Sequence, residues 1–387
     1  MQVIEKLIHP DQVGYVRGRF IGEGIKTIEG IIDYVKHHKL GGYLLAIDFE
    51  KAFDSLEWEF IWDMLKAYGF PNEFIAAIKM IYNNIEACVI NGGNISPFFS
   101  ISRGVRQGQP SSAPLFILAI ELLLIKLRAD KNIEGIYVLN KEIKFSALAD
   151  DITNFSKNIQ SIRLILNELE SFRIVSGLSG NLSKFELMAL GNSERCLVTY
   201  KNETIKWVDI IKITRIFFSN KNCDEMVSKN FEDIVGKVQN ILKIWKPLNL
   251  SILGRITVVK TYAISQLLPK SNMVNPSEDF LKELNNVIFK FIWNDKPDKI
   301  KRTSLISNYD EGGLKAPNLD TIVKTQRLMW IKRFLYSSDH NWKQIMTWQL
   351  SKIGGKDILE NTNISVKYLI KSDMMPFYRD TLIAWSH

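Results

Sequence analysis

The feature that most constrains this chain is a pair of adjacent carboxylates, Asp150 and Asp151, with a short apolar run on each side. The runs Phe145 to Ala149 and Ile152 to Phe155 are of strand length, which predicts a tight β-hairpin with both carboxylates at its tip. Two ionised carboxylates held side by side repel each other, so their proton affinity rises unless a cation neutralises them. The pair therefore predicts either a metal site or an ordinary solvent-exposed turn.

A third carboxylate at the end of an apolar strand favours the metal site. The run Leu44 to Ile47 ends at Asp48, well before the hairpin in the chain. Strand-end carboxylates on neighbouring strands can hold two Mg²⁺ ions roughly 3.5 to 4 Å apart, an arrangement that supports in-line displacement at phosphorus. The sequence thus predicts two-metal chemistry at the junction of these strands.

Composition sets the broad class of the protein. With 387 residues, 46% of them hydrophobic, the chain can bury a substantial core in two or three domains. Its net charge of +8 is compatible with a polyanionic partner. The three cysteines are odd in number and far apart, so we expect no disulfide-linked partner, and the oligomeric state is left open. The longest apolar run is too short to span a membrane and the start lacks a secretory signal, which predicts an intracellular protein without a membrane partner.

Hydrophobic periodicity predicts an α+β fold. Strands and helices alternate over residues 1–225, and the architecture expected there is an antiparallel sheet with helices on one face. The pattern becomes helical from about residue 226, which predicts a second domain over residues 226–335. Residues 336–387 carry no pattern that we can interpret.

Three segments, in this order and spacing, resemble the palm motifs of reverse transcriptases. They read A-I-D-F-E-K-A-F-D from Ala46, R-Q-G-Q-P from Arg106 and A-D-D from Ala149, and are most similar to the LINE-type (non-long-terminal-repeat) retrotransposon branch. Segments near Arg19 and from Leu253 to Trp293 resemble that branch's fingers and thumb. The resemblance implies a right-hand polymerase, with partial fingers and palm over residues 1–225 and a helical thumb-like domain over residues 226–335.

The resemblance also implies an activity and a set of roles. The expected reaction is RNA-directed DNA synthesis, in which deoxynucleoside triphosphates are joined to the 3′-hydroxyl of a DNA primer on an RNA template, in the cytoplasm and nucleus. The implied ligands of two Mg²⁺ ions, for which Mn²⁺ could substitute, are Asp48, Asp150 and the carbonyl of Phe49, with Asp151 supporting them. The implied nucleotide-binding residues are Phe53, Gln107, Gly108 and Lys184, and the implied nucleic-acid contacts are Arg19, Arg106, Arg255 and Lys260.

Departures from the family pattern keep alternatives open. The earlier finger segments, the upstream endonuclease and the C-terminal Cys/His-rich segment are not found, so the chain resembles a fragment. Arg215 stands where the family has a turn glycine in its primer-gripping segment. One alternative is therefore a catalytically inactive remnant that only binds nucleic acid. The other is an unrelated two-metal nuclease or phosphatase, although those usually use more histidine ligands than this chain places near its aspartates.

Overall fold

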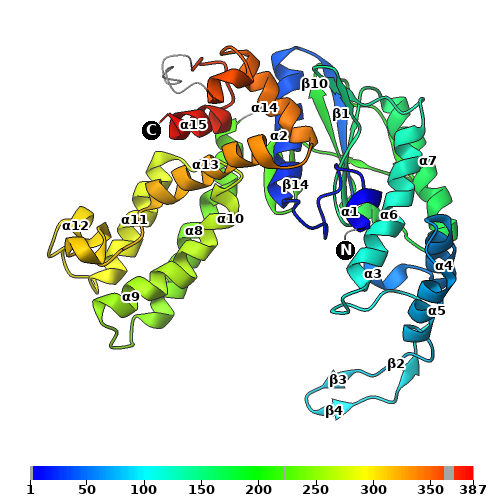
Figure 1. Cartoon of the computed structure of the whole chain (residues 1–387), viewed down its shortest axis with the longest axis horizontal. Helices are drawn as coiled ribbons and strands as arrows, with labels where there is room; N and C mark the ends of the chain where they lie inside the picture. The colour runs from blue at the N-terminus through cyan, green and yellow to red at the C-terminus, as the bar shows by residue number, and fades with distance from the viewer. Residues whose placement is uncertain (1–2, 222, 361–369, 387) are drawn as a thin grey trace. The chain divides into compact units, whose positions relative to one another are not determined.

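The computed structural model describes residues 3–221, 223–360 and 370–386, and it divides into two compact units, Met1–Asp209 and Ile210–His387 (Figure 1). The first unit combines a sheet with helices and the second is mainly helical, so the predicted α+β class is confirmed. The division falls ahead of the position near residue 226 that the sequence suggests. The assignment of fingers, palm and thumb to residue ranges stays a prediction.

A five-stranded sheet forms the centre of the first unit. Its strands lie in the order β13-β10-β1-β9-β8, and the central strand β1 pairs antiparallel with both β10 and β9. The sheet is mixed, because β13 joins β10 in parallel. Leu44 and Leu45 of β1 are both fully buried, as expected for a strand that is covered on both faces. The strands are β1 (Gly41–Ile47), β8 (Phe145–Leu148), β9 (Asp151–Ser156), β10 (Glu186–Gly191) and β13 (Lys206–Trp207).

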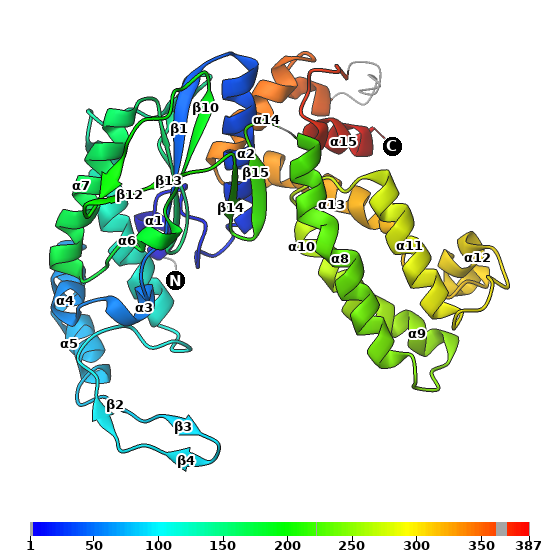
Figure 2. The same ribbon diagram turned by 180° about the vertical axis from the view of Figure 1, so that it is seen from behind.

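Helices cover both faces of this sheet, which corrects the prediction of helices on one face. Leu45 and Ile47 share a hydrophobic core with α6 (Ser112–Ala129) and α7 (Ile159–Ser176). On the opposite face, α2 (Ile21–His37) packs on β8 and β10 (Figure 2). Its Gly24 lies against Ser146 of β8. Successive side chains of a strand point to opposite faces, and here both sets are buried, so each face requires its own cover.

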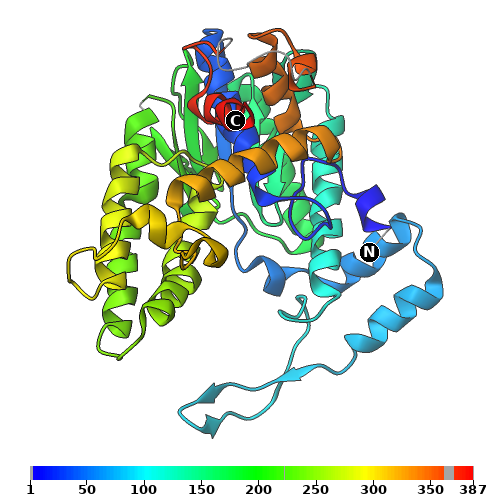
Figure 3. The ribbon, with the colours of Figure 1, turned by 60° about the vertical axis from the view of Figure 1, so that its left-hand side comes forward.

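The remaining elements of the first unit surround the sheet. The segment between α5 and α6 forms a long β-arm, built from the pairs β2–β5 and β3–β4 (Figure 3). The helices are α1 (Ile4–Leu7), α3 (Ala52–Ser55), α4 (Trp58–Ala67), α5 (Asn72–Ile81) and the 3₁₀ helix η1 (Leu182–Lys184). The small strands are β2 (Glu86–Ala87), β3 (Ile90–Asn91), β4 (Asn94–Ile95), β5 (Phe99–Ser100), β6 (Ile136–Val138), β7 (Lys141–Ile143), β11 (Thr199–Tyr200) and β12 (Glu203–Thr204).

The second unit begins with the hairpin of β14 (Ile210–Ile213) and β15 (Ile216–Ser219), followed by helices. The long helix α8 (Cys223–Trp245) packs against α10 and α11. Within the described ranges, no helix is long and apolar enough to cross a membrane. The other elements are α9 (Ile252–Val258), the π-helix η2 (Val259–Ala263), α10 (Ile264–Ser271), α11 (Glu278–Ile292), α12 (Arg302–Ile306), η3 (Tyr309–Glu311), α13 (Leu319–Tyr336), α14 (Asn341–Ser351), η4 (Lys356–Leu359) and α15 (Pro376–Trp385).

Candidate active site

The β8–β9 hairpin carries the adjacent carboxylates, as the sequence predicts. Leu148 pairs with Asp151, so the connecting turn consists of Ala149 and Asp150 alone. Asp150 therefore lies at the tip, whereas Asp151 is the first residue of β9. Ala149 has a φ of 55°, in the left-handed region that a residue with a Cβ rarely adopts. Asp150 therefore directly follows a residue whose strained backbone must be stabilised by contacts with its surroundings.

Asp48 reaches the same place from the end of β1. Ile47 pairs with Ile152, so the next residue in register, Asp48, lies across from Asp151. Beyond it, the N–H groups of Asn181 and Glu50 form 2.8 Å hydrogen bonds with the carbonyls of Asp48 and Ser179 respectively. Because successive peptide groups of an extended chain point to opposite edges, the carbonyl of Phe49 is directed toward the β9 side. One backbone oxygen and three carboxylates therefore converge at this end of the sheet.

The three carboxylates influence one another electrostatically. Burial is the main cause that raises the pKa of Asp150, and the negative charge of Asp48 raises it further. Burial, followed by the charges of Asp150 and Asp48, raises the pKa of Asp151 to about 6. Lys184 neutralises part of this negative charge, because its Nζ lies 3.0 and 3.1 Å from the two carboxylate oxygens of Asp48. This bond raises the pKa of Lys184, so the lysine is a cation held against Asp48.

The donor set fits a hard divalent cation. Carboxylate and carbonyl oxygens are the ligands that Mg²⁺ and Mn²⁺ prefer, and Mg²⁺ usually keeps several waters and takes the rest of its ligands from substrate phosphates. The described part of the chain contains no group of three acidic, histidine or cysteine side chains already arranged to hold a metal ion. The charges of Asp150 and Asp48 contribute to the raised pKa of Asp151, and Asp48 already holds an ammonium group, so the negative charge of the cluster favours a cation here. The residues thus fit a metal that is completed by its substrate.

Phe53 and the loop before α6 lie together. Phe53, in α3, is half-buried, and its ring stacks on that of Phe116 with centroids 4.6 Å apart and has Tyr15 at its edge. The N–H of Val105 donates to the carbonyl of Phe53 (2.6 Å), which ties the loop to α3. In the loop, Arg106, Gln107 and Gly108 are exposed, and Gly108 has a φ of 87° that favours glycine.

Of the four residues predicted to contact nucleic acid, two donate hydrogen bonds to backbone carbonyls of other residues in the chain. Arg19 donates to the carbonyls of Ile8, His9 and Gln12 at 2.6 to 2.7 Å. Arg255 of the second unit is buried and donates to the carbonyls of Leu250 and Phe291. These bonds give both guanidinium groups a structural role. Lys260, also in the second unit, and Arg106 are exposed, and nucleic-acid contact by all four stays a prediction.

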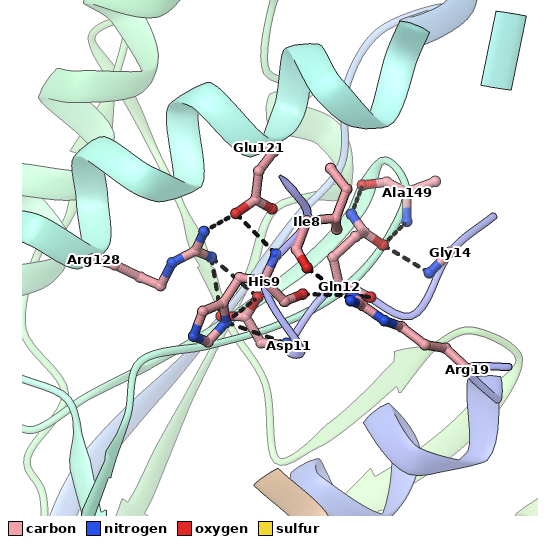
Figure 4. A network of polar contacts seen from close by, with 9 residues as sticks. All are labelled: Ile8, His9, Asp11, Gln12, Gly14, Arg19, Glu121, Arg128 and Ala149. Atoms are coloured by element: carbon pink, nitrogen blue, oxygen red, sulfur yellow. Dashed lines mark hydrogen bonds and ion pairs between the residues drawn. The ribbon is translucent and has the colours of Figure 1, made fainter. Parts of the chain in front are cut away.

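One residue that the sequence analysis did not select contacts the hairpin tip directly. The side chain of Gln12 accepts a hydrogen bond from the N–H of Ala149 (2.8 Å) and donates one to its carbonyl (3.3 Å) (Figure 4). No local pattern could have indicated this contact, because it joins positions 137 residues apart.

Comparison with known proteins now assigns the family. Residues 1–214 match the family model described as reverse transcriptase (RNA-dependent DNA polymerase). The chain belongs to the reverse transcriptase family. The match covers Asp48, Asp150 and Asp151 together with Lys184, so the cluster described above lies wholly within the reverse transcriptase part of the chain.

Retrotransposon proteins are among its relatives. The chain is 27% identical to the transposon TX1 uncharacterized 149 kDa protein of Xenopus laevis, over 99% of this chain and 30% of that protein. It is 25% identical to the retrovirus-related Pol polyprotein from type-2 retrotransposable element R2DM of Drosophila melanogaster, over 82% of this chain and 31% of that protein. These relatives confirm the predicted non-long-terminal-repeat branch. The chain spans about a third of the length of these curated relatives.

Solved structures of telomerases are also similar. Apo telomerase from Candida tropicalis is 13% identical, with a TM-score of 0.41 over 89% of this chain and 60% of that one. Telomerase from Candida albicans in complex with a fragment of telomeric RNA is 13% identical, with a TM-score of 0.36 over 89% of this chain and 54% of that one.

Proposed function

We propose that this chain catalyses RNA-directed DNA synthesis for a non-long-terminal-repeat retrotransposon, extending a DNA primer on an RNA template with deoxynucleoside triphosphates. The observation that carries this proposal is the convergence of Asp48, from the end of β1, with Asp150 and Asp151 of the β8–β9 hairpin. The match of residues 1–214 to the reverse transcriptase family supports it, because all three carboxylates lie within those residues. The predicted presence in cytoplasm and nucleus stays a prediction.

The carboxylates provide the charge for phosphoryl transfer. Asp48, Asp150 and the carbonyl of Phe49 would hold two divalent ions, Mg²⁺ or Mn²⁺ in its place, with Asp151 supporting them. When bound, such ions lower the proton affinity of the primer hydroxyl and stabilise the charge on the leaving pyrophosphate. The chain's own contribution is position and charge, because phosphoryl transfer needs little covalent chemistry from side chains.

Lys184 has two roles in this proposal. Without a metal, its ammonium group neutralises Asp48 across the 3.0 Å contact. Its side chain is 60% exposed, so it can swing away from Asp48 toward an incoming triphosphate. A lysine is a suitable phosphate ligand, because it carries a compact charge on a flexible stem. Phe53, Gln107 and Gly108 would form the wall and floor of the same nucleotide site, since Gly108 allows close approach to its backbone.

The test is primer extension by the purified chain. A labelled DNA primer annealed to an RNA template is incubated with the four deoxynucleoside triphosphates and Mg²⁺, and in parallel with Mn²⁺. We expect template-directed extension, and we expect Asp150→Asn, which removes one charge at constant volume, to reduce it at least about 100-fold. The melting temperature of this variant should stay equal to or above that of the parent, because burial and Asp48 both disfavour the charged form of Asp150.

Two outcomes would contradict the proposal. If the folded chain binds the primer–template but does not extend it with either metal ion, it is a nucleic-acid-binding remnant. If Asp150→Asn extends primers as well as the parent, the carboxylate cluster is not the catalytic centre.

A further inference from the structure

The hairpin tip is held by a side chain from a distant part of the chain. Gln12 is fully buried, and its amide brackets Ala149 by accepting from the N–H and donating to the carbonyl of that one residue. The same Gln12 oxygen accepts from the N–H of Gly14 at 2.8 Å. The bracketed residue directly precedes Asp150, so the amide fixes both peptide groups of the residue next to the catalytic carboxylate (Figure 4).

The backbone around Gln12 brings the amide to this position. Residues 11–13 run beside β8 and form one parallel β-bridge, between Gln12 and Ala147: the N–H of Val13 donates to the carbonyl of Ala147 (2.8 Å), and the N–H of Ala147 donates to that of Asp11 (2.9 Å). Gly14 then passes so close to the tip that a Cβ there would lie 2.5 Å from the nitrogen of Ala149. Gln12 and the tip are therefore held in contact from two sides.

The Gln12 segment is itself anchored. The guanidinium group of Arg19 donates hydrogen bonds to the carbonyls of Ile8, His9 and Gln12 and so holds the segment together. Arg128 of α6 forms an ion pair with the buried Asp11 at 3.0 Å and another with Glu121, which accepts from the N–H of His9. Bonds from α6 and from Arg19 thus hold the segment in a fixed place (Figure 4). Gln12 can position the hairpin tip because its own segment is fixed by these contacts.

The left-handed conformation of Ala149 explains why such support is needed. A non-glycine residue in this region costs on the order of 1 to 3 kcal/mol and persists only where the surroundings determine it. Gln12 supplies support of this kind, because it bonds to both the N–H and the carbonyl of Ala149 while that residue holds its left-handed conformation. If the amide is lost, the turn can relax, and Asp150 moves with it.

We propose that Gln12 is a positioning residue that fixes the tip of the β8–β9 hairpin and thereby the direction of the Asp150 carboxylate. The catalytic part of this inference rests on the proposed polymerase function. Gln12 itself does not touch the substrate in this proposal, so its loss acts on turnover through Asp150. We therefore expect kcat to fall while the KM for nucleotide and the Kd for primer–template change little.

The test compares Gln12→Met with a matched control. Gln12→Met keeps the length of the side chain but removes its three hydrogen bonds, and we expect kcat to fall about 10- to 100-fold, the scale of a small misplacement of a reacting group. The control is Asn154→Leu, which removes another fully buried amide from the same hairpin, one that bonds to the carbonyl of Lys144 away from the tip. This control should lose comparable stability but keep kcat within about threefold of the parent.

Hydrogen exchange gives a readout that does not depend on catalysis. In Gln12→Met, amide exchange should become faster in a peptide covering residues 147–152 and stay unchanged in α7, whereas Asn154→Leu should leave the tip protected. Gln12→Asn serves as a milder variant, because it keeps an uncharged amide but is one methylene shorter, so it can form only part of the contact with Ala149. Its kcat and tip exchange should lie between those of the parent and Gln12→Met.

The outcomes separate this inference from the proposed function. Unchanged tip exchange in a folded Gln12→Met protein, or faster exchange with an unchanged kcat, would overturn the positioning role. If the parent chain does not polymerise at all, the proposed function fails. Faster exchange at the tip would then still support Gln12 as the residue that fixes the hairpin.

Discussion

Phe53 occupies a position where a single ring could decide which sugar is accepted. Its ring is held by the stack on Phe116 and by the edge of Tyr15, yet the residue remains half-buried, so part of it is accessible. If this ring lies beneath the incoming sugar, it leaves no space for a 2′-hydroxyl, the group that distinguishes ribose from deoxyribose. The stack would make the exclusion rigid.

We predict that Phe53→Val lowers discrimination against ribonucleotides by about 1 to 3 kcal/mol, the range that pocket shape supplies. The measurement is the ratio of kcat/KM for a deoxynucleotide and its ribonucleotide. Phe60→Val is the control, because Phe60 is a half-buried phenylalanine of α4 that packs on Phe172 instead. A loss of stability in both variants with an unchanged ratio would assign Phe53 to the core alone.

Glu121 gives the molecule a pH-dependent stability. Burial raises its pKa from 4.5 to about 7, against the opposing effect of Arg128. Since the folded state binds this proton more tightly than the unfolded chain, the contribution of Glu121 is fully present below pH 4.5 and is lost as the pH rises to about 7. The charged or titratable groups that face it are His9, Asp11, Arg19, Tyr68 and Arg128.

We predict that Glu121→Gln becomes more stable relative to the parent as the pH rises from 4.5 to 7, by an amount on the order of 3 kcal/mol, and that the difference then levels off. Melting temperatures of the two proteins across this range provide the measurement. A difference that runs the other way, with the parent gaining stability toward neutral pH, would show that Arg128 stabilises the carboxylate more than burial destabilises it.

At the scale of elements, local signals predicted more than distant ones. Apolar runs and strand propensity indicated the β8–β9 hairpin and the strand that ends at Asp48, because those patterns reside within a few neighbouring residues. Periodicity could not show that α2 covers the second face of the sheet, since that depends on how separate elements pack. The contacts of Gln12 with Ala149 and of Lys184 with Asp48 were out of reach for the same reason.

The β14–β15 hairpin shows a turn that forms despite its sequence. Ile213 pairs with Ile216, so Thr214 and Arg215 are the two turn residues, with φ values of 47° and 69°. Two-residue hairpin turns with positive φ at both positions favour asparagine followed by glycine. Arg215 thus adopts the conformation for which the family uses glycine, at an energetic cost to the hairpin.

We predict that Arg215→Gly stabilises the protein by about 1 kcal/mol, because glycine reaches this conformation without steric strain. Lys212→Gly is the control: Lys212 is an exposed residue within β14, where glycine should destabilise instead. Urea denaturation of both variants measures whether each substitution raises or lowers the free energy of unfolding. Equal destabilisation by the two substitutions would mean that Arg215 forms contacts that outweigh the strain of its backbone.

At the scale of the whole molecule, the net charge of +8 should govern how binding depends on salt. Contact with a polyanion releases condensed counterions, so its affinity falls as salt is added. We predict that the affinity for a primer–template duplex falls about tenfold or more between 50 and 200 mM KCl, as expected for about two or more phosphate contacts. Fluorescence anisotropy provides the measurement, and a response that does not depend on salt would contradict a nucleic-acid partner.

The central place of β1 in the sheet determines when the site can exist during synthesis. Its two neighbours, β9 and β10, are encoded much later in the chain, ending at Ser156 and Gly191. At ribosomal rates of about 5 to 20 residues per second, β1 waits on the order of ten seconds for both partners. During that interval its apolar residues Leu44 and Leu45 have no sheet to join, and such exposed strands aggregate easily. Expression with ample chaperone should therefore raise the yield of folded protein, because the nascent chain is most exposed to aggregation before the catalytic end of the sheet can close.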